Sequence, residues 1–71
     1  MTTEQQQALA RLATDLDALH AQAVTMIQIV QAPWMRSIVP ADTRTLIAEA
    51  EFRLDTAAEN VARLAKEATN G

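Results

Sequence analysis

Two long segments of this chain carry apolar residues that alternate at steps of three and four, and a pair of prolines separates the two segments. The first segment places at these steps Leu9, Leu12, Leu16, Leu19, Ala23, Met26 and Val30. The second segment repeats the spacing with Ile47, Ala50, Leu54, Ala57, Val61, Leu64 and Ala68. Because this spacing brings side chains to one face of an α-helix, each segment is predicted to form a helix with an apolar stripe.

The prolines set the expected boundaries. Pro33 and Pro40 each disfavour helix in the residue before them, so they end one helix and delay the next. The chain is therefore expected to be a single domain, residues 1–71, with a helix over about 3–32, a loop over 33–42 and a helix over about 43–69.

Residues suited to capping stand at these boundaries. Thr3 and Gln6 have the spacing of a capping box, in which each side chain bonds to the backbone amide of the other residue. Asp42 is expected to be the N-cap of the second helix, and Gly71 is expected to end that helix in a left-handed conformation.

The two stripes fit one another when the chain folds back at the prolines. This pairing places Leu19 opposite Ala57 and Met26 opposite Ala50, so that large side chains meet alanines. Such alternation fills an antiparallel seam without voids. The predicted fold class is all-α, an antiparallel two-helix hairpin with coiled-coil-like packing.

Size predicts self-association. A core built from 71 residues rarely supplies more than about 3–5 kcal/mol, so a homodimer that forms a four-helix bundle is expected. Small and apolar residues on one flank of the seam are the expected dimer face: Ala13, His20, Val24, Ile27, Ala58, Ala62 and Ala65. The other flank, which includes Arg11, Asp15 and Gln22, is expected to be solvated. The alternative is that the alanines serve helix propensity alone.

There are few candidates for catalytic chemistry in this sequence. His20 is the only histidine and there is no cysteine, so one chain cannot assemble a zinc site or a catalytic triad. We expect no enzymatic activity, no cofactor and no metal. His20 is expected to lie beside Ala58, within reach of Asp55 or Asp17, as a packed or hydrogen-bonded residue. A pH-sensitive contact is the alternative, because imidazoles change charge near neutral pH.

An apolar surplus gathers at the loop end. The predicted partner-binding patch contains Trp34, Met35, Arg36, Ile38, Val39 and Phe52. Phe52 falls away from the seam, and Trp and Arg are frequent anchors in protein interfaces. The alternative is that the loop folds over this end as a hydrophobic plug, or that a dimer covers Phe52.

The charge balance bears on partners and location. With six Lys and Arg against nine Asp and Glu, the net charge of −3 argues against a nucleic-acid surface. Glu51, Asp55 and Glu59 recur at four-residue steps, and we expect a solvated acidic strip that complements a basic patch on a partner. No apolar run is long enough for a membrane span and no signal peptide is evident, so a cytoplasmic location is expected.

These features predict a non-enzymatic adaptor or inhibitor that occludes an unidentified partner protein. The hairpin resembles the plasmid-encoded Rop regulator, which implies a four-helix dimer that binds paired RNA. It is also similar in size and shape to small phage-encoded anti-activators, which implies docking on a host protein. Both are likenesses of architecture, so no functional position is carried over. The alternatives are a structural oligomerisation segment and a Rop-like RNA-binding bundle.

Overall fold

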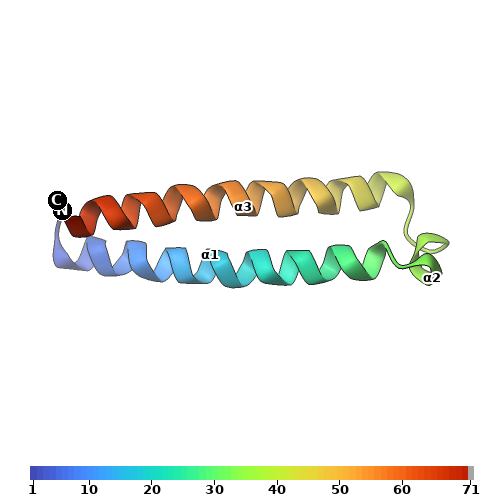
Figure 1. Ribbon diagram of the computed structural model, residues 1–71, viewed down its shortest axis with the longest axis horizontal. Helices are drawn as coiled ribbons and strands as arrows, with labels where there is room; N and C mark the ends of the chain where they lie inside the picture. Colours follow the sequence, from blue (N-terminus) through green and yellow to red (C-terminus); the bar gives the residue numbers. More distant parts are fainter. Residues whose placement is uncertain (71) are drawn as a thin grey trace.

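The computed structural model describes the backbone of residues 1–70 and the side chains of residues 1–69, so the predicted cap at Gly71 lies outside the described residues. The helices are α1 (Thr3–Val30), α2 (Pro33–Arg36) and α3 (Ala41–Asn70). The long helices α1 and α3 run antiparallel and side by side, with α2 at the bend, and the start of α1 and the end of α3 at the opposite end (Figure 1). The predicted all-α antiparallel hairpin is confirmed.

A capping box starts α1, one residue earlier than predicted. The Gln5 amide donates to Thr2 Oγ1 at 3.1 Å, and the Thr2 amide donates to Gln5 Oε1 at 2.9 Å. The prediction of Thr3 and Gln6 was wrong because consecutive threonines and glutamines permit either register. The register that forms leaves Gln6 free to reach α3, where its Nε2 donates to the Ala68 carbonyl at 2.9 Å.

The bend is more helical than the sequence predicted. Pro33 is the first residue of α2, a position where its fixed φ suits a helix and its missing amide hydrogen costs nothing. After Pro40 the chain becomes helical at once, and the Pro40 carbonyl accepts a bond from the Arg44 amide at 3.0 Å. Asp42 therefore lies inside the first turn of α3, and the prediction that it is the N-cap was wrong.

The seam between α1 and α3 differs from the predicted layers. Leu12 and Leu19 are 47% exposed, Met26 is 51% exposed and Leu64 is 48% exposed, so these four do not form the core. Within the described part of the chain, the buried residues are Ala23, Val30 and Ala58. Half-buried residues that continue the seam are Leu9, Ala13, Leu16, His20 and Ile27 on α1, and Ile47, Leu54, Ala57, Val61, Ala65 and Ala68 on α3.

The physical reason is a rotation of both long helices about their own axes, since on α3 the predicted seam residues Ala50 and Leu64 are exposed and Ala58 is buried instead. Leu9, Leu16 and Ala23 belong to both the predicted and the observed seam, but their partner stripe is Ala13, His20 and Ile27, not Leu12, Leu19 and Met26. Small residues at the centre of the seam let the helix backbones approach closely, as the 2% exposure of Ala23 and the 7% exposure of Ala58 indicate.

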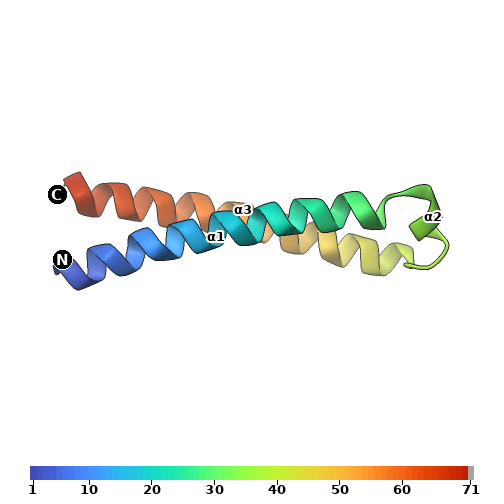
Figure 2. The ribbon, with the colours of Figure 1, turned by 90° about the horizontal axis from the view of Figure 1, so that it is seen from below.

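The resulting molecule is a thin rod. It measures 51 × 14 × 14 Å, and the two helices cross in the side view (Figure 2). Its radius of gyration is 15.9 Å, against about 11 Å for a compact domain of this length. Among the described residues no large side chain is fully buried. Two regions are therefore open to partners: the tip at the bend and the sides of the rod.

Candidate functional site

The tip of the rod is held by a dense set of backbone hydrogen bonds. The amides of Met35 and Arg36 donate to the Ala32 carbonyl at 2.9 and 3.1 Å, and the amides of Ile38 and Val39 donate to the Met35 carbonyl at 2.9 Å each. These bonds satisfy the backbone groups that a loose loop would leave to water. The bend is therefore a defined structure.

Arg44 ties this structure to α3. Its Nη1 donates to the Val39 carbonyl at 2.7 Å and to the Arg36 carbonyl at 3.3 Å. A guanidinium that donates to two carbonyls makes charge-assisted bonds, which are stronger than neutral ones. Arg44 is half-buried, so water competes only partly for these contacts.

The side chains of the tip differ in exposure. Met35 and Val39 are half-buried, whereas Trp34 is 68% exposed and Ile38 is 69% exposed. Arg36, between them in sequence, is also exposed. We call Trp34 and Ile38 the tip pair. In the single chain Trp34 does not plug the end of the hairpin, which was the alternative that the sequence left open.

Phe52 is the one member of the predicted patch that the fold sets apart. It lies eleven residues into α3, which at 1.5 Å per residue is about 16 Å along the rod from the start of that helix. Its side chain is 68% exposed. Of the five predicted residues at the bend, Trp34, Arg36 and Ile38 are exposed and Met35 and Val39 are half-buried. The helical rise separates Phe52 from all of them.

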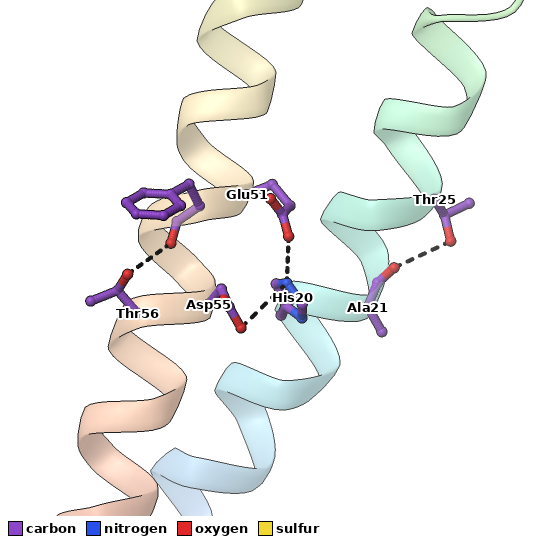
Figure 3. Close-up of polar contacts among 7 residues, drawn as sticks. His20, Ala21, Thr25, Glu51, Asp55 and Thr56 are labelled. Carbon is purple, nitrogen blue, oxygen red and sulfur yellow. Dashed lines mark hydrogen bonds and ion pairs between the residues drawn. The ribbon is translucent and has the colours of Figure 1, made fainter.

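His20 lies in the seam and bridges the two long helices (Figure 3). Its Nε2 is hydrogen-bonded to Glu51 Oε1 at 2.6 Å and lies 3.8 Å from Asp55 Oδ1. The predicted contact with Asp55 is confirmed, and the contact with Glu51 was missed because the predicted register placed His20 nearer the C-terminal end of α3. The sequence predicted a solvated acidic strip of Glu51, Asp55 and Glu59. In the structure Glu59 is exposed, whereas Glu51 and Asp55 are half-buried.

The predicted dimer face is largely used inside the single chain. Ala58 is buried. The half-buried members of this face are Ala13, His20, Val24, Ile27 and Ala65, and the exposed member is Ala62. Most of these side chains already pack between α1 and α3, which leaves little of their surface for a second molecule.

A different apolar surface is exposed along the rod, and sequence reasoning missed it because it assigned these side chains to the seam. We call it the lateral face, and its members are Leu12, Leu19, Met26, Ile29, Leu46 and Leu64. Leu12, Leu19 and Met26 recur every seven residues and so form one stripe on α1. His20 meets Glu51 and Asp55 on one side of the seam. By helical spacing Leu12 and Leu64 flank the seam on the other side, so α1 and α3 contribute to the same face.

Within residues 1–70, no three His, Asp or Glu side chains gather as a metal site would require. None of the helices in this part of the chain combines the length and the apolar character needed to cross a membrane.

No protein-family model, curated protein or solved structure matches the chain.

Proposed function

We propose that this protein is a non-enzymatic protein-binding module, an adaptor or inhibitor that occludes a functional surface of its partner. One observation carries the proposal: a hydrogen-bonded bend holds Trp34 and Ile38 outward with about two thirds of each side chain in water. An exposed tryptophan on an ordered support is the type of residue that dominates binding energy in protein interfaces.

The bend is suited to binding because it is ordered before a partner arrives. Association costs free energy when flexible side chains and loops must be fixed, and a preformed surface lowers that cost. Here Arg44 and the backbone bonds to Ala32 and Met35 already hold the loop. The tip pair can therefore enter a pocket without the loop having to order first.

The side chains of the tip indicate what kind of surface the partner must have. Trp34 and Ile38 require an apolar pocket deep enough for an indole ring, and the exposed Arg36 favours a carboxylate at the pocket rim. The proposed setting is the cytoplasm, a reducing compartment with which a chain that lacks cysteine is compatible. A phage- or plasmid-encoded regulator of a host protein fits this description, and small size and hairpin shape support that part of the proposal.

Affinity capture with matched variants tests the proposal. The tagged protein, Trp34→Ala, Ile38→Ala and Phe52→Ala are each used to capture partners from an extract of the native host, with helicity checked by circular dichroism. We expect a specific partner that is lost with Trp34→Ala and reduced with Ile38→Ala. Phe52 is as exposed as the tip pair but distant from it, so Phe52→Ala serves as the control.

Two results would contradict the proposal. Undiminished capture by folded Trp34→Ala and Ile38→Ala would show that the tip does not bind. Loss of capture with Phe52→Ala alone would move the binding site to the side of α3.

A second candidate function is a structural oligomerisation segment. The observation in its favour is the lateral face, which runs along both long helices and is uncovered in the single chain. Under this alternative the hairpin joins larger assemblies and the tip pair has no partner of its own. A Trp34 whose fluorescence is blue-shifted and resists quenching in the assembled protein would favour it.

A further inference from the structure

We propose that a second copy of this chain docks on the lateral face, with the two bends at the same end, and that the pair forms a four-helix bundle. This inference goes beyond the proposed function because it concerns the side of the rod and not its tip. It also differs from the dimer predicted from sequence, which used the opposite flank of the seam.

The exposed area of the chain is larger than a monomer of this mass should have. A monomeric protein of 7.7 kDa is expected to expose about 4,300 Å² of solvent-accessible surface. This chain exposes 5331 Å². The excess of roughly 1,000 Å² is close to the ~800 Å² that each partner buries in a protein interface of standard size. A second copy would remove the excess.

The shape of the lateral face suits a second copy of itself. On α1 the central stripe is large, with Leu12, Leu19 and Met26 about half exposed. On α3 the positions next to the seam between Leu46 and Leu64 have small side chains, Ala50 and Ala57, and the exposed Arg53 and Asn60 border them on the outer side. The α1 half of the face therefore has projecting side chains. The α3 half has small side chains next to the seam, and we call this part the low region.

This contrast selects one orientation. Two hairpins can stack face to face about a two-fold axis in one of two orientations. The axis is either parallel to the rod, which we call rotation along the rod, or perpendicular to it, which we call rotation across the rod. Rotation across the rod would set α1 on the partner's α1, so that large side chains meet large ones and alanines meet alanines. Rotation along the rod sets α1 on the partner's α3, so that Leu19 and Met26 meet the low region around Ala50 and Ala57. Complementary packing of large against small side chains favours rotation along the rod.

The edges of the face agree with this orientation. Ile29 lies one residue before the end of α1 and Leu46 lies five residues after the start of α3, so both are near the bend. They are 46% and 64% exposed. With the two bends at the same end, Ile29 of one copy lies over Leu46 of the other.

Solution mass measurement tests the docking. We expect light scattering coupled to size-exclusion chromatography to give twice 7.7 kDa for the natural chain and 7.7 kDa for Leu19→Arg, which places a charge at the centre of the face. Phe52→Arg is the matched control: it makes the same kind of change at an exposed apolar residue outside the face and should remain dimeric. Leu64→Arg repeats the test from α3 in case Leu19→Arg fails to fold.

Several outcomes would overturn the docking. They are a monomeric natural chain at all concentrations up to millimolar, a dimeric Leu19→Arg or Leu64→Arg that retains its helicity, and a monomeric Phe52→Arg. A dimer should also show a thermal midpoint that rises with protein concentration, and a constant midpoint would contradict it. None of these results depends on whether the tip pair binds a partner, so failure of the docking and failure of the proposed function are distinguishable.

The orientation has its own test. The chain has no cysteine, so Ser37→Cys provides a single attachment point for a spin label at the bend. With the bends together, the distance between the two labels in the dimer should be near the width of the bundle. A distance near the 51 Å length of the rod would overturn the proposed orientation.

Discussion

The tip and the lateral face are both apolar and both exposed, but they are built in different ways. The tip is a short segment whose backbone is held by hydrogen bonds, with Arg44 attached to it from α3. The side chains of the lateral face lie along α1 and α3, and their exposure depends on which sides of these two helices turn toward each other. Local bonding therefore determines the tip, whereas packing of the seam determines the face.

The largest effect is expected at the centre of the seam, where the face depends on close helix contact. Ala23→Asp would place an unpaired carboxylate at a site that is 2% exposed, at a cost of about 3 kcal/mol or more. For a hairpin with so small a core, we expect loss of most helical circular dichroism at 222 nm. Ala21→Asp, at an exposed position of the same helix, is the control. A folded Ala23→Asp would show that the seam does not hold the helices.

A smaller effect is expected where Arg44 supports the tip. Arg44→Ala removes the bonds to Val39 and Arg36, each a bond to a charged donor, with a loss of about 1–2 kcal/mol that is confined to the bend. Faster amide hydrogen exchange at Ile38 and Val39 should report it, while exchange in the middle of α1 stays slow. Equal acceleration throughout the hairpin would mean that the tip and the seam are not separable.

A still smaller effect is expected from the polar bridge of the seam. His20→Ala leaves the half-buried Glu51 without its partner, and urea denaturation should show a loss of about 1 kcal/mol. Glu51→Gln in the same background should restore part of this loss, because the carboxylate no longer needs a donor. No recovery in the double variant would indicate that His20 contributes through packing and not through its bond to Glu51.

The smallest effect on stability is expected at the tip pair. Trp34→Ala removes a side chain that is mostly in water, so the free energy of unfolding should change by less than about 0.5 kcal/mol. Partner capture should nevertheless be lost. If Trp34→Ala destabilised the hairpin by several times this amount, the indole would be part of the structural core, and the distinction between tip and seam would fail.

Much of the fold could be predicted because it depends on short-range signals. Apolar residues at steps of three and four predict helices over both long segments, and Pro33 and Pro40 predict the bend between them. The same signals place Trp34 and Ile38 at the bend. The rise of an α-helix, counted from Pro40 to Phe52, also separates Phe52 from the tip without any tertiary information.

The face of α1 that turns inward could not be predicted in the same way. Leu9, Leu16 and Ala23 have an apolar stripe on either side, one with Leu12 and Leu19 and one with Ala13 and Ile27. Spacing alone does not choose between two adjacent stripes of similar character. The larger side chains suggested the first stripe, and the structure uses the second.

Two long helices, their antiparallel return and the apolar character of the bend follow from the amino-acid sequence, because each depends on residues close together in the chain. The rotation of α1 and α3, the bond between His20 and Glu51 and the exposure of the tip pair arise only when the helices pack. These features depend on how closely two backbones can approach at Ala23 and Ala58, and on polar groups that meet only once the seam has formed.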